Sequence, residues 1–302
     1  MVDLSVDLGF IRLKNPVIPA SGTFGNGEEF RPFFDLDILG ALVLKGIFRN
    51  QRPGNPPPRI RETAAGLLNS IGLAGPGAAE MQSIIRRLAA MTRAPLIVNI
   101  CGDDDEEFAE LAELFSGMNE VALLELNISC PNVRSGGRCP AQDAVHTARL
   151  VRMVKRRARK PLIVKLSPNV PDIGTIARAA EEAGADALSL VNTFLGLAVD
   201  LPARRSVFAN FFAGLSGPAI KPLALKLVWE ACRSVRIPVI GGGGIMNGRD
   251  ALEYILVGSA AIQIGTVNLI EPGAAVRIIA EIEQEMEMLG IHQLDEIRGR
   301  LT

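Results

Sequence analysis

The 302-residue sequence is poor in several features that define common protein classes. It has only two histidines, His146 and His292, which excludes mechanisms built on paired histidines. None of its four cysteines stands in a C-x-x-C pair, so the sequence supports neither a zinc site nor an iron–sulfur cluster held by this chain. The formal net charge of −1 argues against a general nucleic-acid binder.

Long apolar runs and nucleotide-binding glycine motifs are also missing. No run approaches the length of a membrane span, and the N-terminus shows no charged-then-apolar signal pattern, so we expect neither a membrane span nor secretion. No G-x-G-x-x-G follows an apolar run and no P-loop is present, which leaves a dinucleotide or nucleoside triphosphate unsupported. The scattered cysteines are typical of free thiols in a reducing compartment, and we expect a cytoplasmic protein. They are Cys101, Cys130, Cys139 and Cys232.

Eight apolar runs alternate with amphipathic stretches along the chain. The runs cover residues 16–20, 41–45, 95–100, 121–128, 161–166, 186–192, 237–241 and 260–265. Such runs are typical of strands covered on both faces, and the spacing of Met81, Ile84, Ile85 and Leu88 between two of them is helical. The count predicts an α/β fold, a (β/α)₈ TIM barrel forming a single domain over residues 1–302, with a doubly wound open sheet as the alternative. An alternating segment at residues 4–13 predicts an N-terminal β-hairpin.

Three connections, 46–75, 129–142 and 193–218, are too long to be plain turns. Each follows the C-terminal end of a predicted strand, so all three should lie on one face of the barrel, where long loops are usually functional.

Side chains at the C-terminal ends of barrel strands converge on one mouth. Here each strand ends in glycine or a polar residue. Leaving the core explains Ser, Asn and Gly at such positions, but it explains Lys45 and Lys165 poorly because buried lysine is costly unless paired. Glycines 241–244 and the pair Gly265-Thr266 follow the seventh and eighth strands, where barrels commonly hold phosphate. We therefore predict a phosphate site there, with a plain tight turn as the alternative.

A mononucleotide such as FMN fits this arrangement, with Lys165 beside the pyrimidine edge of its ring, where a cation stabilises charge developing on reduction. Lys45 and four amides suit a planar substrate with amide-like edges and a carboxylate. The amides are Asn69, Asn127, Asn132 and Asn192. Cys130, just after the fourth strand, is the only plausible titratable base nearby. The alternative is a buried structural cysteine beside turn-forming asparagines.

Seven motifs in order along the chain carry a family resemblance. They are Asn15 to Thr23, Leu44-Lys45-Gly46, Asn69-Ser70-Ile71-Gly72-Leu73, Asn127-Ile128-Ser129-Cys130-Pro131-Asn132, Val164 to Asn169, Asn192-Thr193 and Gly243-Gly244-Ile245. On these motifs the chain resembles the catalytic subunit of a class 1 dihydroorotate dehydrogenase. The resemblance implies an FMN-containing barrel that oxidises dihydroorotate to orotate in pyrimidine biosynthesis. Cys130 would remove the C5 proton while hydride passes from C6 to flavin N5.

The resemblance also implies a subclass and a partner. Class 2 members carry serine in place of the cysteine and have an N-terminal membrane-associating extension, so Cys130 and the start of this sequence indicate class 1. The segments 132–137 and 21–25 resemble subclass 1B. That subclass is linked to NAD⁺ through an electron-transfer subunit carrying FAD and a [2Fe–2S] cluster. The implied assembly is a heterotetramer of two catalytic and two electron-transfer subunits around a homodimer core, with no resident metal on this chain.

Site residues follow from the motifs, position by position. FMN contacts are implied for Ser21, Lys45, Gly46, Asn99, Asn127, Lys165, Val191, Gly217, Gly243, Gly244, Gly265 and Thr266. Substrate contacts are implied for Lys45, Asn69, Ser70, Ile71, Gly72, Leu73, Asn127, Asn192 and Thr193.

Other functions stay open at this point. Two are close: a fumarate-linked class 1A enzyme, and a flavin enzyme acting on another dihydropyrimidine. Two are more distant: a Schiff-base lyase using Lys45 or Lys165, and a non-catalytic barrel that binds a phosphate-bearing ligand. The lyase leaves Cys130 and the amides without a role.

Overall fold

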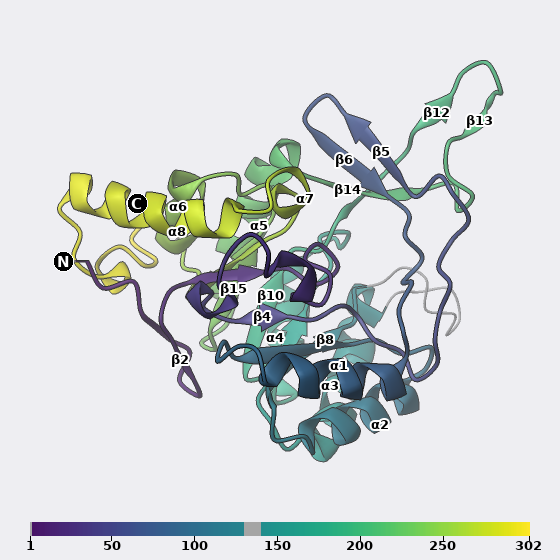
Figure 1. The fold of residues 1–302 in the computed structure, drawn as a ribbon, viewed down its shortest axis with the longest axis horizontal. Coiled ribbons are helices and arrows are strands. Elements are labelled where there is room, and N and C mark those ends of the chain that lie inside the picture. The colour runs from purple at the N-terminus through teal and green to yellow at the C-terminus, as the bar shows by residue number, and fades with distance from the viewer. Residues whose placement is uncertain (1, 130–139) are drawn as a thin grey trace.

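Eight parallel strands form the central sheet of the protein, a computed structural model that describes residues 2–129 and 140–302 (Figure 1). Their order in the sheet is β3-β16-β15-β10-β9-β8-β7-β4. The bounds are β3 (Val17–Pro19), β4 (Leu42–Val43), β7 (Leu96–Ile100), β8 (Val121–Asn127), β9 (Leu162–Lys165), β10 (Ala187–Leu190), β15 (Val239–Gly242) and β16 (Ala261–Ile264). The Gly40 N–H, just before β4, donates to the Val17 carbonyl of β3 (3.0 Å), which brings the two outermost strands of this order together. The sheet thus curls into a nearly closed barrel, which confirms the predicted fold over the open sheet.

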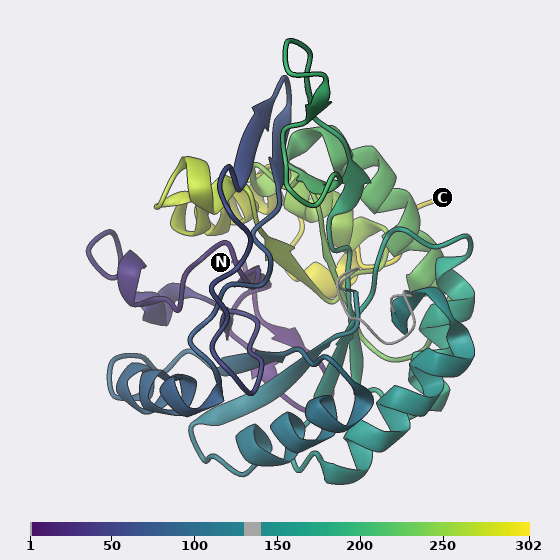
Figure 2. The same ribbon diagram turned by 90° about the vertical axis from the view of Figure 1, so that its right-hand side faces the viewer.

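The helices form a ring around the strands (Figure 2). They are α1 (Ala78–Ala89), α2 (Asp105–Ser116), α3 (Ala144–Arg157), α4 (Ile173–Glu182), α5 (Lys221–Ser234), α6 (Gly248–Leu256), α7 (Val267–Ile270) and α8 (Ala274–Leu289). The predicted stripe of α1 is buried, and Asp104, Asp143 and Asp172 each cap a helix by accepting from backbone N–H groups. No helix in the described ranges is long and apolar enough to cross a membrane.

The connection between β3 and β4 contains only the short 3₁₀ turns η1 (Glu28–Phe30) and η2 (Leu36–Ile38). Aromatic side chains provide packing here, because the Phe24 and Phe30 rings stack with their centroids 3.7 Å apart. The N-terminal hairpin is present as β1 (Val6–Asp7) and β2 (Arg12–Leu13). Its prediction is confirmed.

Two of the long connections pair with each other to form a second, antiparallel sheet. Its order is β11-β14-β6-β5, with bounds β11 (Phe194–Gly196), β14 (Ala213–Ser216), β6 (Gly66–Asn69) and β5 (Ile60–Thr63). The small hairpin of β12 (Val199–Asp200) and β13 (Arg205–Ser206) extends beyond it (Figure 1). Periodicity did not reveal this sheet because β5 is exposed throughout, and its strands come from segments far apart in the chain. Both connections leave from the C-terminal ends of barrel strands, as expected.

Candidate active site

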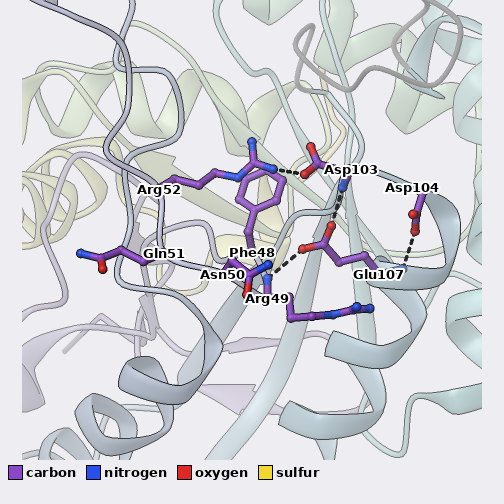
Figure 3. Close-up of a pocket in the computed structure, with 8 residues that line it drawn as sticks. All are labelled: Phe48, Arg49, Asn50, Gln51, Arg52, Asp103, Asp104 and Glu107. Carbon is purple, nitrogen blue, oxygen red and sulfur yellow. Dashed lines mark hydrogen bonds and ion pairs between the residues drawn. The ribbon is translucent and has the colours of Figure 1, made fainter.

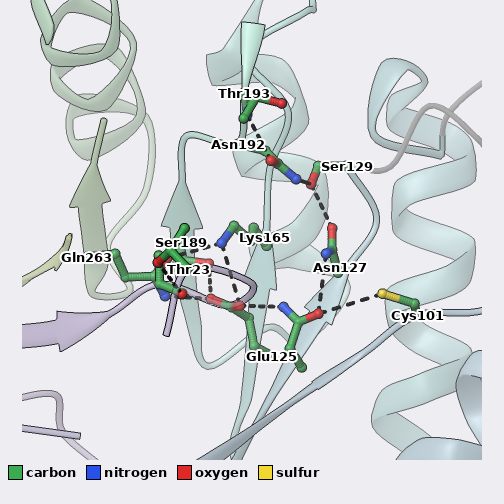
Figure 4. A network of polar contacts seen from close by, with 12 residues as sticks. Thr23, Cys101, Glu125, Asn127, Ser129, Lys165, Ser189, Asn192, Thr193 and Gln263 are labelled. Carbon is green, nitrogen blue, oxygen red and sulfur yellow. Dashed lines mark hydrogen bonds and ion pairs between the residues drawn. The ribbon is translucent and has the colours of Figure 1, made fainter. Parts of the chain in front are cut away.

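A buried carboxylate lies in the interior of the barrel, near the C-terminal ends of the strands (Figure 4). Glu125 of β8 is fully buried. Its Oε1 accepts hydrogen bonds from Ser189 Oγ of β10 (2.8 Å) and Gln263 Nε2 of β16 (2.7 Å), and its Oε2 accepts from Asn99 Nδ2 of β7 (2.5 Å). These side chains point inward because residues alternate between the two faces of a strand.

Lys165 ends β9 beside this carboxylate and is only 5% exposed. Its Nζ donates to Gln263 Oε1 (3.2 Å) and lies 3.8 Å from Glu125 Oε2. The buried ammonium is therefore compensated by a carboxylate, as its position at the end of an apolar strand required.

A chain of polar side chains runs from the carboxylate towards the mouth. Asn127 Nδ2 donates to Asn99 Oδ1 (3.3 Å), Ser129 Oγ donates to Asn127 Oδ1 (2.7 Å), and Asn192 Nδ2 donates to Ser129 Oγ (2.5 Å). The Thr193 N–H donates to Asn192 Oδ1 (2.8 Å). The structure thus joins the ends of three strands through side chains that the sequence placed at the mouth. Asn99 lies one residue before the end of β7, as in the predicted strand over residues 95–100, and it is fully buried.

Lys45 follows β4 and is half-buried. Burial is the largest effect on its pKa and lowers it below the ordinary value of 10.5; repulsion from Arg59 lowers it further, while Glu29 opposes this. Arg59 is held by the carbonyls of Asn55 (2.5 Å) and Pro53 (2.9 Å). Two neighbouring cations favour an anionic ligand such as a carboxylate.

The predicted substrate segment from Asn69 to Leu73 continues from β6. Asn69 Nδ2 donates to the Gly214 carbonyl (3.3 Å), and Ser70 accepts from Asn55 Nδ2 at its hydroxyl (3.0 Å). Gly72 and Leu73 both have positive φ, 72° and 57°, which is uncommon for leucine. The Ser70 N–H donates to the Arg59 carbonyl (2.8 Å), so the backbone of this segment is hydrogen-bonded to the residue whose charge acts on Lys45.

The glycine loops after β15 and before α5 approach each other closely. Gly217, Gly243 and Gly244 have φ of 101°, 130° and 76°. A Cβ on Gly244 would lie 2.8 Å from Lys221 N and 2.9 Å from Gly217 O. Only glycine fits this conformation and spacing.

Two further predicted residues are hydrogen-bonded to residues beside these loops, and three more lie after other barrel strands. Thr266 Oγ1 donates to Ser216 Oγ (2.9 Å), and the Val191 N–H donates to the Gly242 carbonyl (3.0 Å). Gly265 does not share the steric requirement, because a Cβ there would meet its nearest neighbour at 3.7 Å. Ser21 lies in the turn after β3. Gly46 follows Lys45, and its Cβ would lie 2.9 Å from Asn99 Oδ1.

The predicted base lies outside the described residues. Cys130 and Asn132 fall between the two described ranges: the first ends at Ser129 and the second begins at Pro140. Ser129 is buried and belongs to the polar chain described above. The roles assigned to Cys130 and Asn132 stay predictions.

Sequence reasoning missed Glu125, Ser189, Gln263 and Arg59. Two of them carried a usable signal, since Glu125 and Gln263 are polar residues inside predicted buried strands, where such side chains need a partner. Ser189 and Arg59 carried none, because a serine in a strand and an arginine in a long loop are both ordinary.

A separate pocket of about 320 Å³ opens between the loop after β4 and the start of α2 (Figure 3). It is lined by Phe48, Arg49, Asn50, Gln51, Arg52, Asp103, Asp104 and Glu107. Arg52 stacks on the Phe48 ring, 3.6 Å from its centroid, and forms an ion pair with Asp103. None of the predicted site residues lines this pocket. Besides the Arg52–Asp103 pair, Arg49 forms an ion pair with Glu110, and the Asp104 and Glu107 carboxylates accept from backbone N–H groups. The barrel mouth is the better candidate.

No group of three or more His, Cys, Asp or Glu side chains in residues 2–129 and 140–302 could hold a metal ion.

Comparison with known proteins gives one consistent result. The family model for dihydroorotate dehydrogenase matches residues 3–286. The chain is 49% identical over 299 residues to a protein of Desulforudis audaxviator named dihydroorotate dehydrogenase B (NAD(+)), catalytic subunit, covering 99% of this chain and 97% of the relative. A Geobacter sulfurreducens protein of the same name is 49% identical over 302 residues, covering 99% and 98%.

The fold has a solved counterpart. The structure of DHODH from Eimeria tenella in complex with ferulenol superposes with a TM-score of 0.83 at 22% identity, covering 99% of this chain and 88% of that one. At this identity the likeness concerns the fold alone. The family match and the relatives, in contrast, extend over nearly the whole sequence. They confirm the resemblance carried by the motifs: the chain belongs to the dihydroorotate dehydrogenase family.

Proposed function

We propose that this protein oxidises (S)-dihydroorotate to orotate in pyrimidine biosynthesis. The observation that carries the proposal is the buried Lys165–Glu125 pair, which is hydrogen-bonded through Asn99 to the amide of Asn127 at the barrel mouth. Relatives at 47–49% identity are named dihydroorotate dehydrogenase, which supports the substrate assignment.

FMN is the proposed cofactor, and the residues present fit it. Gly217, Gly243 and Gly244 leave no room for a Cβ, because one on each would collide with neighbouring protein atoms. Such close-packed glycine loops, here called the glycine cradle, let backbone N–H groups approach a phosphate. We assign the phosphate to this cradle with Gly265 and Thr266, and the flavin ring to Lys165 and the residues around it. The proposed ring contacts are Ser21, Lys45, Gly46, Asn99, Asn127 and Val191. When bound, FMN would supply the acceptor for the hydride from C6.

The side chains of the mouth would bind and orient the substrate. Lys45, with Arg59 beside it, would bind the carboxylate of the ring. Asn69, Asn127 and Asn192 would hydrogen-bond its amide edges, with residues 70–73 and Thr193 completing the site. Cys130, next to the buried Ser129, would take the C5 proton as a thiolate.

We also propose a partner for this chain. The relatives carry the words "NAD(+)" and "catalytic subunit" in their names. By analogy we propose an electron-transfer subunit with FAD and a [2Fe–2S] cluster, in a heterotetramer of two subunits of each kind around a homodimer core. Exposed apolar side chains near the second sheet, including Leu197, Leu201, Phe211 and Phe212, provide surface suited to such contacts.

One experiment tests the reaction and two of its rivals. The purified protein is loaded with FMN and mixed anaerobically with dihydroorotate or dihydrouracil. Bleaching of the flavin by dihydroorotate alone is the expected result. Bleaching by dihydrouracil at a comparable rate would move the enzyme to another dihydropyrimidine, and a protein without flavin affinity would favour the lyase.

The electron acceptor needs its own test. The protein is purified from its native source, and iron and FAD are assayed beside FMN. Co-purifying FAD, iron and a second chain, with turnover by NAD⁺, is the expected result. A homodimer that turns over with fumarate would identify the class 1A alternative.

A further inference from the structure

Glu125 is the common acceptor of two branches of hydrogen bonds, and the proposed reaction gives it no role so far. Its carboxylate is enclosed by β7, β10 and β16 and is not exposed at all. Burying a carboxylate is costly unless donors and an opposite charge compensate it. Here three neutral donors and one cation do so.

The inner branch links Glu125 to Lys165. Lys165 Nζ donates to Gln263 Oε1, and Gln263 Nε2 donates to Glu125 Oε1. An ammonium has donors only, so it fixes which end of the Gln263 amide faces it. The inner branch therefore has a single permitted direction.

The outer branch links Glu125 to the mouth. Asn192 donates to Ser129, Ser129 to Asn127, Asn127 to Asn99, and Asn99 to Glu125 (Figure 4). Each amide oxygen accepts from the mouth side and each NH₂ donates inward. A carboxylate at the inner end imposes this direction, because it can only accept.

We propose that Glu125 is a positioning residue: it sets the direction of the amides that face the substrate and balances the charge of Lys165 at the flavin. This inference rests on the proposed function, because it assigns Asn127 and Asn192 to the substrate and Lys165 to FMN. Through the outer branch Glu125 determines whether Asn127 and Asn192 present the correct donor and acceptor to the ring. Through the inner branch Glu125 partly neutralises Lys165 and so sets the net positive charge beside the flavin.

Glu125→Gln tests both effects with almost no change in volume. The new amide has one accepting and one donating end, so it cannot accept on both sides. Lys165 prevents reversal of Gln263, so the donating end must face Asn99. Asn99 and the amides beyond it must then turn around, and Lys165 loses its counter-charge.

Two equilibrium quantities report these changes without measuring turnover. Orotate affinity, read from the perturbed flavin spectrum, should fall about 10- to 100-fold, the scale of one or two mismatched buried hydrogen bonds. The preference of the protein for reduced over oxidised FMN should rise about tenfold, a shift in midpoint potential of about +30 mV for a two-electron couple. A residue that only supports the fold would lower the melting temperature and leave the potential unchanged at full FMN occupancy.

Two further variants act as controls. Ser189→Ala removes one neutral donor but keeps the charge and the direction of both branches. Orotate affinity and the preference for reduced over oxidised FMN should therefore each stay within about threefold of wild type. Asn99→Asp combined with Glu125→Gln restores an accepting group for Asn127 and keeps the net charge. Orotate affinity should then recover to within about threefold of wild type.

The double variant also keeps the test decisive if Glu125→Gln alone does not fold. In that case, recovery of orotate binding in the folded double variant supports the inference, and failure to recover overturns it. If Glu125→Gln folds, the inference is overturned when either orotate affinity or the preference for reduced over oxidised FMN stays within about threefold of wild type. Wild-type protein mixed with dihydroorotate is measured first: an unreduced flavin there would refute the proposed function instead.

Discussion

Lys165 Nζ and Glu125 Oε2 lie 3.8 Å apart in the barrel interior, and their side chains are 7% and 0% exposed. The pair joins two neighbouring strands, β9 and β8, at the level where the barrel becomes polar. The Glu125 carboxylate compensates the charge of the buried Lys165 ammonium, so Lys165 can stay charged inside the barrel and interact with a ligand there.

Lys165→Ala should impair both folding stability and flavin binding. Loss of one member of a buried ion pair leaves the other uncompensated, and the usual cost is about 3–5 kcal/mol. We expect a fall of that order in the free energy of unfolding by urea, and a low FMN content after purification.

The matched control is Lys226→Ala. Lys226 forms an exposed i,i+4 ion pair with Glu230, so the loss should stay below about 1 kcal/mol. Normal flavin occupancy and normal reduction in Lys165→Ala would count against its assigned place at the ring.

Gly244→Ala should abolish the phosphate cradle. The added Cβ would meet Lys221 N at 2.8 Å in a backbone with φ of 76°, so the loop must shift. We expect FMN affinity, measured by quenching of flavin fluorescence, to fall by about 100-fold or more, the equivalent of about 2.7 kcal/mol of lost phosphate contacts.

Gly290→Ala is the control that separates the effect of a steric clash from the effect of backbone strain at positive φ. Gly290 ends α8 with φ of 68°, and a Cβ there would have no neighbour within 4 Å. This variant should lose about 1–2 kcal/mol of stability from strain and bind FMN normally. Equal FMN affinity in the two variants would show that the cradle is misplaced.

Lys45→Met should stabilise the ligand-free protein while weakening orotate binding. Burial and Arg59 lower the pKa of Lys45, so the folded protein holds this proton less tightly than the unfolded chain does. Stability should therefore rise with pH as Lys45 loses its proton, below the ordinary value of 10.5, and the variant should show less of this rise.

Orotate affinity should respond in the opposite sense. A charged Lys45 binds the carboxylate, so affinity should decline as the pH passes the lowered pKa, and Lys45→Met should lose about 10- to 100-fold at neutral pH. Binding titrations and urea unfolding across pH measure both effects. A variant that is less stable without ligand, or that binds orotate as wild type does, would contradict the assignment; Lys226→Met serves as the exposed control.

The barrel and much of its mouth could be predicted from sequence because they rest on local patterns. Apolar runs gave the strands, and Lys45, Lys165 and the glycines followed from their places at strand ends. The second sheet could not be predicted, since β6 and β14 pair although they are far apart in the sequence, and neither presents a regular apolar face. Glu125 could have been singled out as a charged residue inside a buried strand, but its partners could not, because only the closed barrel shows which side chains share its interior.

Cys130→Ala tests the central claim most directly. Cys232→Ala is the matched control, because burial raises the pKa of the Cys232 thiol to about 12, so it stays protonated at neutral pH and cannot take a proton. Both variants are loaded with FMN and mixed anaerobically with dihydroorotate in a stopped-flow instrument. We predict wild-type flavin content in both, and flavin reduction slowed about 100-fold or more in Cys130→Ala alone, the usual scale for losing a positioned general base. Near-normal reduction in Cys130→Ala would contradict the account.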